Sequence, residues 1–456
     1  MKTYTKRALS ALILLSLVLS LLLSSLTSCN LFAYVAESKE EIESNIESTL
    51  ANDESKHDFV SDYLREWGLP KFDRLKYYFT ENCFDKVYNY DGGLPETLTH
   101  AAETAKLFTQ YYYGEIDHND QVKVTDALIR CYIAVLDDPY AVYRSPEETE
   151  SFTTDMSGSF GGIGVVVRYD HENQSVIVET VYNDSPAEKA GLKKGDYLYS
   201  VDGQTIDDIG YQNIATYIRG EIGTTVEITV IRDGEKINLT AVRKNMEEVS
   251  VSSRIEDGNI GYVQILSFKG NTLEQFVSAI TSLEEAGVKG IIFDLRDNPG
   301  GYLTAVTDVL SYILESGLDL VTYRYKDSAP IVVKTEDDAK GFDHVINLPM
   351  TVICNENTAS AGEIFTAALR DYAKDGLIDV TIVGATTYGK GIMQNSYKYN
   401  LDGSSITMTI AYYDPPCGIN YHGIGIEPDI PVTNTDSEDL QLLTARAKLL
   451  ELINAN

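Results

Sequence analysis

The sequence predicts a multidomain α/β protein, and three segments of different character support this prediction. From residue 259 onward, short apolar runs alternate with segments of helical periodicity, as in a sheet covered by helices. Residues 159–243 consist of short β-rich runs separated by glycines. Residues 58–152 carry apolar side chains at helical spacing. A chain of 456 residues is long enough to form two or three domains.

The composition is that of an acidic globular protein. Apolar residues make up 43% of the chain and charged residues 23%, which is ordinary for a folded protein. Acidic residues number 69 against 37 lysines and arginines, a formal net charge of −32. A nucleic-acid-binding protein needs a basic surface, so we predict no nucleic-acid partner.

The N-terminus resembles an export signal. Basic residues precede an apolar run at residues 8–23, and Leu-Thr-Ser-Cys follows at residues 26–29. These four residues resemble a bacterial lipobox, whose cysteine is acylated and becomes the first mature residue. We therefore predict a signal peptide over residues 1–28 and a lipid anchor at Cys29, on the outer face of a bacterial membrane. A plain secretory signal and an uncleaved anchor helix are the alternatives.

Two segments separate this signal from the β-rich region. Residues 29–56 are charged and weakly amphipathic, which favours a tether that lifts the folded part off the membrane. Residues 57–155 are predicted to form a helical region that packs on the rest of the protein or on a second subunit. A homodimer through this region is a hypothesis.

Residues 158–244 resemble a PDZ domain in the order of their β runs, with one helix near residues 208–219. The loop Gly161, Gly162, Ile163 and Gly164 resembles the carboxylate-binding loop of that domain. There, successive backbone N–H groups bind the end of a peptide, and the following strand pairs with it. The resemblance implies partners that are unfolded polypeptides or polypeptides with an exposed C-terminus. An ordinary hairpin entry is the alternative for the glycines alone.

Residues 349–371 predict a buried strand, a polar turn and a helix that begins near Ser360. Small neighbours leave this serine uncrowded, as in a nucleophile elbow, although Thr358 stands where the elbow has its first glycine. Serine is also a preferred helix cap, so a purely structural role is the alternative.

A serine nucleophile needs a base, and Lys390 is the candidate. It lies between two glycines and is followed four residues later by Gln394, which could hold the amine without adding a negative charge. A lysine base has to be desolvated to bring its pKa from about 10.4 to roughly 7–8. A surface lysine is the alternative, and a hydrolase that uses His344 or His422 is a weaker one.

Residues 289–310 predict another strand, a glycine-rich turn and a helix. In the turn, Pro299 fixes the backbone, and Gly300 and Gly301 allow N–H groups to point into a cavity. An oxyanion hole needs this arrangement. An ordinary loop between a strand and a helix is the alternative.

Several motifs together resemble the series found in the carboxyl-terminal processing (tail-specific) serine peptidases. They are LDDPYAVYRSPEE at 136–148, DLRDNPGG at 294–301, NENTASAGEIFTAAL at 355–369, YGKGIMQ at 388–394 and HGIGIEPDIPV at 422–432. With the PDZ-like segment, the resemblance covers roughly residues 125–435. One departure is Gly362, which stands where the family commonly has a second serine.

The resemblance implies a serine endopeptidase that works through an acyl-enzyme. Ser360 would be the nucleophile, Lys390 the general base and Gln394 its orienting partner. Gly300, Gly301 and Ala361 would supply the oxyanion donors. The implied core is of the crotonase or Clp-protease type, built of ββα units over residues 245–435 and followed by a C-terminal helix at 436–456.

No metal or organic cofactor is needed for this chemistry. Cys83, Cys131, Cys354 and Cys417 show no metal-binding or redox spacing; an exported chain permits disulfides, but we predict no pairing. A second class of function stays open, a binding lipoprotein that holds peptides in the PDZ domain and the core groove without cutting them. A resting state in which the PDZ domain blocks the site is also open.

Overall fold

The computed structural model describes residues 107, 110–112, 115–117, 120–135, 138–170, 175–325, 328–335, 344–399, 402–435 and 437–455. The predicted signal peptide, the lipid anchor at Cys29, the tether, Cys83 and most of the helical region lie outside these residues. Within the described ranges, none of the helices has the length and apolar content needed to cross a membrane. The chain divides into two compact units, each of which is described by itself.

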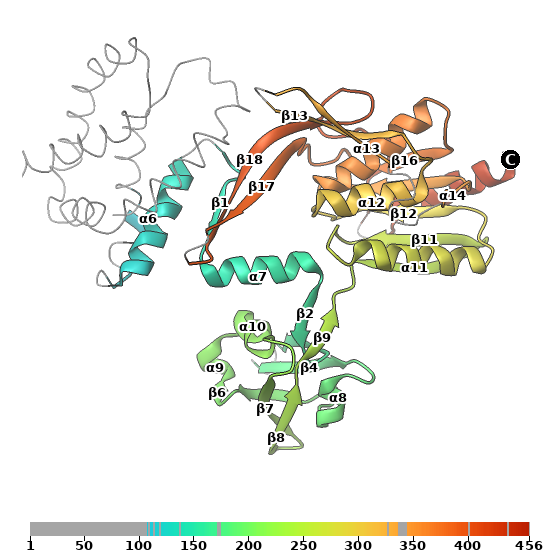
Figure 1. Cartoon of the computed structure of the whole chain (residues 1–456). Helices are drawn as coiled ribbons and strands as arrows, with labels where there is room; N and C mark the ends of the chain where they lie inside the picture. The colour runs from blue at the N-terminus through green and yellow to red at the C-terminus, as the bar shows by residue number, and fades with distance from the viewer. Residues whose placement is uncertain are drawn as a thin grey trace, which may run out of the picture. The chain divides into compact units, whose positions relative to one another are not determined.

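A six-stranded sheet forms the core of the larger unit, which comprises residues 150–322, 332–391 and 414–456 (Figure 1). In spatial order its strands are β10 (Val251–Glu256), β11 (Ile260–Ile265), β12 (Ile291–Asp294), β15 (Met350–Cys354), β16 (Val380–Gly384) and β19 (Ile430–Pro431). Only the pair β10 and β11 is antiparallel. Parallel strands that are covered by helices on both faces are mostly apolar along their length. In β12 and β15 every residue is buried, as this arrangement requires.

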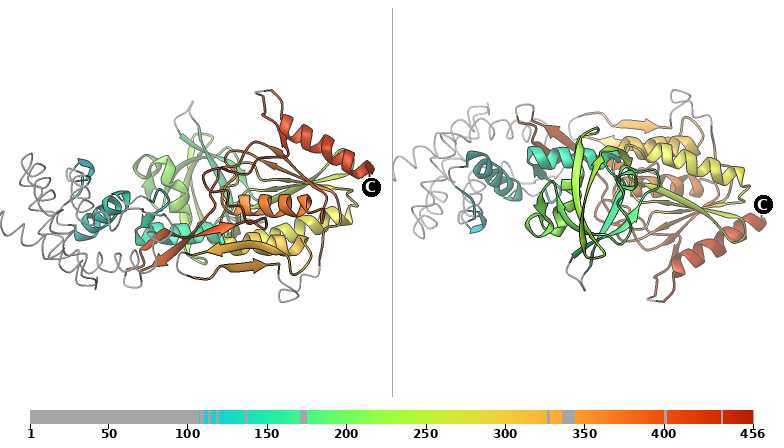
Figure 2. Two further views of the ribbon diagram at one scale, coloured as in Figure 1. Left: turned by 90° about the horizontal axis from the view of Figure 1, so that it is seen from above. Right: turned by 90° about the horizontal axis from the view of Figure 1, so that it is seen from below.

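Helices cover both faces of this sheet (Figure 2). On one face, α14 (Leu440–Ala455) packs on Ile292 and Ile353. The other face carries α11 (Thr272–Glu285), α12 (Leu303–Ile313) and α13 (Ala361–Lys374). Phe293 points to that side, where its ring centroid lies 5.8 Å from Phe276 of α11 and 5.4 Å from Phe365 of α13. The predicted α/β class is confirmed.

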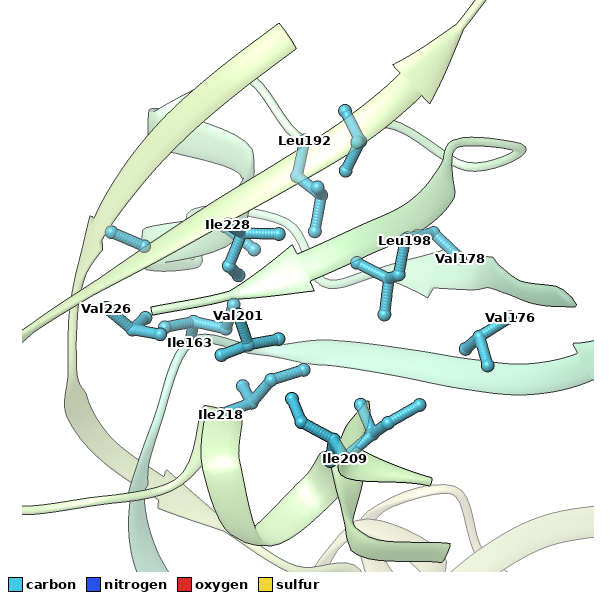
Figure 3. Packing of buried hydrophobic residues seen from close by; sticks show 14 residues of the cluster. Ile163, Val176, Val178, Leu192, Leu198, Val201, Ile209, Ile218, Val226 and Ile228 are labelled. Carbon is cyan, nitrogen blue, oxygen red and sulfur yellow. The ribbon is translucent and has the colours of Figure 1, made fainter. Parts of the chain in front are cut away.

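The PDZ-like domain is an antiparallel sheet with short helices. Its strands are β3 (Val165–Asp170), β4 (Ser175–Val181), β5 (Tyr197–Val201), β7 (Thr225–Arg232) and β8 (Glu235–Val242), and β6 (Gln204–Thr205) pairs with β5. An Asp-Gly turn at 233–234 joins β7 to β8, and both residues have positive φ, as a tight hairpin requires. Apolar side chains from the strands and helices converge in one cluster between them (Figure 3).

The helical part of this domain differs from the sequence expectation. In place of one helix near residues 208–219 there are α9 (Ile206–Ile209), a 3₁₀ turn at Tyr211–Asn213 and α10 (Ile214–Ile218). Gly210 separates them with a φ of 78°, which a continuing right-handed helix does not permit. The remaining short helix is α8 (Pro186–Ala190), whose N-cap is Ser185.

A two-stranded ribbon carries the chain into and out of the PDZ-like domain. It pairs β2 (Ser159–Gly162) with β9 (Lys244–Glu247), and α7 (Pro146–Ser157) precedes it. The Lys269 Nζ lies 3.0 Å from Asp155 Oδ1 and 2.8 Å from Glu248 Oε2. One largely buried lysine therefore ties the entering segment to the leaving segment.

The described part of the smaller unit contains α6 (Gln121–Val135), β1 (Val142–Arg144), β17 (Ile392–Lys398) and β18 (Ser405–Asp414). β17 and β18 form a hairpin, and β1 is antiparallel to β18. A bulge shifts their register, because Met393 faces Ala411 and Gln394 faces Thr409. The remaining strands β13 (Asp319–Arg324) and β14 (Ile331–Lys334) each have residues in both units.

Ile228→Ala tests the core of the PDZ-like domain. Ile228 is 2% exposed among the converging side chains, so its truncation is expected to lower the free energy of unfolding of that domain by about 2–5 kcal/mol. Urea unfolding monitored by amide hydrogen exchange of β5 and β7 measures this. The neighbouring Glu227 is exposed, and Glu227→Ala should change the value by less than about 0.5 kcal/mol. An equal fall in the free energy of unfolding in the two variants would contradict a core position for Ile228.

Candidate active site

Three loops that carry the candidate residues meet at one edge of the six-stranded sheet. β12, β15 and β16 are parallel, so the turns that follow them leave from the same edge. Backbone hydrogen bonds join these turns: Ala359 N–H donates to Asn298 O at 2.9 Å, and Tyr388 N–H donates to Thr358 O at 3.0 Å. The structure therefore brings the Ser360, Gly300 and Lys390 segments together.

Ser360 adopts a strained backbone conformation at the first turn of α13. Its φ is 52° and its ψ is −118°, which few residues other than glycine adopt. Gly300 lies directly against it, since a Cβ at position 300 would lie 2.7 Å from the Ser360 Cβ and 3.0 Å from the Ala361 N. Only glycine fits there, and the contact holds the serine on a sharp turn between strand and helix.

The buried carboxylate of Glu363 connects the serine segment to the lysine segment. Its Oε2 accepts hydrogen bonds from Ser360 N–H at 2.9 Å and from Lys390 N–H at 2.8 Å. Its Oε1 accepts from Thr387 Oγ1 at 2.6 Å and from Gly389 N–H at 2.7 Å. Four donors from two loops thus converge on one side chain that is 0% exposed.

The electrostatics of Glu363 reflect its burial. Loss of water raises the pKa of this carboxyl above its usual range, and the hydrogen bonds from Thr387, Lys390, Gly389 and Ser360 lower it only in part. All four groups are donors, so only the ionised carboxylate accepts all of them.

The glycine turn corrects one expectation about the oxyanion donors. Gly300 N–H donates to Asn298 Oδ1 at 2.8 Å, so it does not point into the site for a substrate oxygen. Asn298 is 0% exposed and donates in turn to Ile265 O at 2.8 Å, which fixes the turn. The N–H groups of Gly301 and Ala361 donate to no acceptor among the described residues. Two of the three expected donors are therefore available.

A buried ion pair anchors the start of the same turn. Arg296 donates to both carboxylate oxygens of Asp294, and Tyr262 OH donates to Asp294 Oδ2 at 2.7 Å. The Arg296 Nη1 also lies 2.7 Å from Asp439 Oδ1, just before α14. Burial raises the pKa of Tyr262 to about 12, and the charge of Asp294 adds to this. The turn is thus joined to the C-terminal segment.

The two histidines considered as bases have other environments. His344 stacks on the ring of Tyr312 of α12 at 4.2 Å and forms a hydrogen bond to Glu284 of α11. Burial lowers the pKa of His422; a hydrogen bond with the Gly389 backbone raises it, and the positive charge of Lys390 lowers it. A neutral His422 lies near the lysine, in a turn whose Gly423 N–H donates to Gly389 O at 2.8 Å.

Gln394, the expected partner of the lysine, belongs to β17 of the smaller unit. Its Nε2 donates to Tyr140 O at 2.6 Å.

The expected tail-binding loop begins later than its glycines suggest. Gly161 and Gly162 belong to β2 and face Asn245 and Lys244 of β9. Ile163 and Gly164 form the connection to β3, and their carbonyls accept from the N–H groups of Ala187 and Tyr182. Ile163 as a whole residue is 1% exposed, and its side chain belongs to the hydrophobic core of the domain.

Sequence reasoning missed Glu363 and Asn298. A signal for Glu363 was present, because Ser-x-x-Glu at residues 360–363 is a capping-box pattern in which the glutamate binds the N-cap N–H. No comparable signal exists for Asn298, whose side-chain partners come from the turn itself and from β11.

Comparison with known proteins gives two domain matches and relatives of similar length. Residues 259–432 match Peptidase family S41, and residues 161–242 match the PDZ domain. The chain is 34% identical to the carboxy-terminal processing protease CtpA of Bacillus subtilis (strain 168) over 341 residues, which cover 75% of this chain and 70% of that protein. The solved structure of a photosystem II D1 C-terminal processing protease covers 74% of this chain and 87% of its own, with 26% identity and a TM-score of 0.41.

Glu363→Gln tests the carboxylate that joins the two loops. The amide NH₂ would face two donors, so the free energy of unfolding should fall by roughly 1–3 kcal/mol. A raised pKa in the folded state means that wild type loses stability through this group as the pH rises from the ordinary glutamate pKa to the raised one. In urea unfolding at pH 4–8, the difference in free energy of unfolding between wild type and Glu363→Gln should therefore shrink between these two pKa values and stay constant at higher pH.

The control is Glu356→Gln, an exposed carboxylate in the turn before Ser360. It is expected to change the free energy of unfolding by less than about 0.5 kcal/mol. A difference between wild type and Glu363→Gln that grows with pH would contradict the direction given for the Glu363 pKa.

Proposed function

Because the chain belongs to peptidase family S41, we propose that Ser360 and Lys390 are its catalytic pair and that the PDZ domain binds the C-terminal end of the polypeptide to be cut. The chain is a serine-type peptidase with a PDZ domain. The observation that carries the proposal is Glu363, whose carboxylate accepts the backbone N–H of both Ser360 and Lys390.

In the proposed reaction, the Ser360 Oγ attacks the carbonyl carbon of the scissile peptide bond while the neutral amine of Lys390 takes its proton. The N–H groups of Gly301 and Ala361 donate to the oxyanion that forms. When the C–N bond breaks, the Lys390 ammonium gives its proton to the leaving amine. Water then attacks the ester carbon on Ser360 while Lys390 takes a proton from it. When the bond between the acyl carbon and Oγ breaks, Lys390 gives that proton to the Ser360 Oγ, which restores the free serine and the neutral amine.

Both proposed oxyanion donors fit this reaction. Ala361 N–H is the first of α13, where helix N-termini concentrate positive partial charge. Gly301 N–H comes from the turn that Asn298 holds through its hydrogen bond to Gly300. The donors are held by two separate segments before substrate arrives, and such preorganisation gives electrostatic stabilisation its effect.

The PDZ domain supplies a site for the substrate tail. β3 is one of the edge strands of its sheet, so its outer edge can pair with an added peptide strand. The connection at Ile163 and Gly164, just before β3, would bind the terminal carboxylate with backbone N–H groups, and Gly161 and Gly162 would shape it. Unfolded polypeptides and proteins with an exposed C-terminal tail are the proposed substrates.

We also propose that the chain is exported and held by a lipid on Cys29 at the outer face of a bacterial membrane. The n-region, apolar run and lipobox-like residues 26–29 support this. A homodimer through residues 57–155 is proposed on their helical pattern alone. Light scattering on the soluble protein tests it, and a monomer across micromolar concentrations would count against it.

Cleavage assays with the soluble chain from Asn30 onward test the catalytic pair. With a denatured substrate that ends in free apolar residues, Ser360→Ala and Lys390→Ala should each lower kcat at least about 1000-fold. The wild-type rate should rise between pH 6 and 10, with a midpoint below the free-lysine pKa of about 10.4.

Ser282→Ala and Lys374→Ala replace an exposed serine and an exposed lysine on α11 and α13 and should keep wild-type rates. Cleavage that survives Ser360→Ala would overturn the assignment. A wild-type chain that binds the tail peptide without cutting it, with equal binding in both variants, would favour the binding lipoprotein instead.

Tail recognition is tested by comparing one peptide with a free C-terminus and with an amidated C-terminus. The amide removes the charge that the loop N–H groups would bind, so the Kd should rise at least about tenfold, or about 1.4 kcal/mol. Isothermal titration calorimetry with the Ser360→Ala protein measures this without cleavage. Gly164 has a φ of 76°, and an added Cβ would contact Ser185, so Gly164→Ala should distort the loop. This variant should weaken binding of the peptide with a free C-terminus and leave binding of the amidated peptide unchanged. Equal affinity for the two peptides would exclude a carboxylate site.

A further inference from the structure

Residues 420–426, between β18 and β19, have no role in the reaction described above, although most of them belong to the motif HGIGIEPDIPV at 422–432. Within the larger unit they pack against the glycine-flanked segment that carries Lys390. A Cβ at position 389 would lie 2.9 Å from Gly425 N, and a Cβ at position 391 would lie 2.9 Å from His422 N. The two segments are therefore in direct contact on both sides of the lysine.

Hydrogen bonds hold the backbone around Lys390 from two directions. The N–H groups of Gly389 and Lys390 donate to the Glu363 carboxylate on α13. The Gly389 carbonyl accepts from Gly423 N–H at 2.8 Å, so it is bound by the segment at 420–426. Glu363 thus fixes the N–H groups of the lysine segment, while residues 420–426 bind its carbonyls.

The side chain of Asn420 binds the carbonyl on the other side of the lysine. Its Nδ2 donates to Gly391 O at 3.1 Å and to Asp414 Oδ1 at 2.9 Å, and its Oδ1 accepts from His422 N–H at 2.7 Å. Asp414 is the last residue of β18 and is 7% exposed. One amide therefore joins the lysine segment to the end of β18 and to its own loop.

The chemistry of the three partners requires an amide at position 420. A backbone carbonyl and a carboxylate only accept hydrogen bonds, so the group that faces Gly391 O and Asp414 has to be the NH₂. The His422 N–H only donates, so it needs the oxygen. An aspartate has the same shape but no N–H, and its charge would face the carboxylate of Asp414. The amide orientation is thus set from both ends.

We propose that Asn420 is a positioning residue, which holds the Gly391 carbonyl and thereby fixes the backbone from which the Lys390 side chain extends. This rests on the proposed function, in which Lys390 is the general base. A general base has to lie within hydrogen-bond reach of the proton that it takes, and a misplacement of about 1 Å can lower the rate about 100-fold. Asn420 acts through the lysine backbone and not on the reacting atoms.

The test compares cleavage kinetics of Asn420→Asp and Asn420→Ala with those of wild type, in the soluble chain from Asn30 onward. Asn420→Asp keeps the oxygen that binds His422 N–H but loses both donated hydrogen bonds, and Asn420→Ala loses all three contacts without adding a charge. We expect each variant to lower kcat about 10- to 100-fold with KM within about twofold, because the lysine loses its position while substrate binding is retained. Wild-type kcat in either variant would overturn the proposal.

The pH–rate profile of Asn420→Ala separates a positioning role from a purely structural one. A lysine is neutral near pH 7–8 only while water is kept from it, so a loosened segment should move the midpoint upward, toward the free-lysine pKa of about 10.4. Glu363, His422 and Asp414, which also contact these segments, are unchanged in this variant. Urea unfolding gives the folded fraction in the assay. A fall in kcat that only follows this fraction, with an unchanged midpoint, would overturn the proposal.

Asn259→Asp is the matched control. Asn259 Nδ2 also donates to a backbone carbonyl, that of Gly287. It lies in the turn between β10 and β11, at the edge of the six-stranded sheet opposite to the candidate site. The control loses the same kind of hydrogen bond, so its stability should fall while its kcat stays at the wild-type value. A fall in kcat equal to that of Asn420→Asp would count against a special role for Asn420.

A double-mutant cycle with Lys390→Ala tests the route through the lysine. The substrate is a p-nitrophenyl ester of an N-acylated amino acid, whose leaving group departs without a proton, so a residual rate stays measurable. Once Lys390 is alanine, Asn420→Ala should lower this rate by no more than about twofold. An equal loss in both backgrounds would overturn the proposal. Peptide cleavage in Ser360→Ala would defeat the proposed function, whereas an inactive Ser360→Ala with a fully active Asn420→Ala defeats only this inference.

Discussion

The candidate active site depends on a single buried carboxylate. Glu363 accepts four hydrogen bonds, two of them from the N–H groups of Ser360 and Lys390. Hydrogen bonds to a charged group are each worth about 1.5–3 kcal/mol, and they offset part of the cost of burying this carboxylate, whose pKa stays raised. Strands β15 and β16 bring the two loops to the same edge of the sheet. The hydrogen bonds of Glu363 then hold the loops at a fixed distance from each other.

The strained serine follows from the same constraint. A positive φ at a residue other than glycine costs about 1–3 kcal/mol and persists only where the surroundings demand it. Gly300 contacts Ser360 on one side and Glu363 binds its N–H on the other. Asn298 and the Asp294–Arg296 pair hold the glycine turn in place, so the strain at the serine is supported by groups that take no part in proton transfer.

Local signals in the sequence were sufficient for the α/β class and for the loops that carry the site. Turn glycines and a helix that opens on a serine are short-range signals, so Ser360 and Lys390 could be named as candidates without a structure, and the series of family-like motifs supported that choice. The loss of the Gly300 N–H to Asn298, the break at Gly210 and the contact between Gln394 and Tyr140 depend on φ angles and distant partners. A periodicity pattern does not encode these.

Because β1 pairs with β18, this part of the fold can form only late in synthesis. Arg144 contacts Thr407, which is 263 positions later in the chain. At roughly 5–20 residues per second, a ribosome needs on the order of 10–50 s to supply the missing partner. Strands β3 to β8 of the PDZ domain pair with one another, so this sheet can form in that interval. Strand β1 has to stay unpaired until β18 has been synthesised. Ser360 and Lys390, the proposed catalytic pair, also emerge late, so under that proposal a chain still under synthesis would lack peptidase activity.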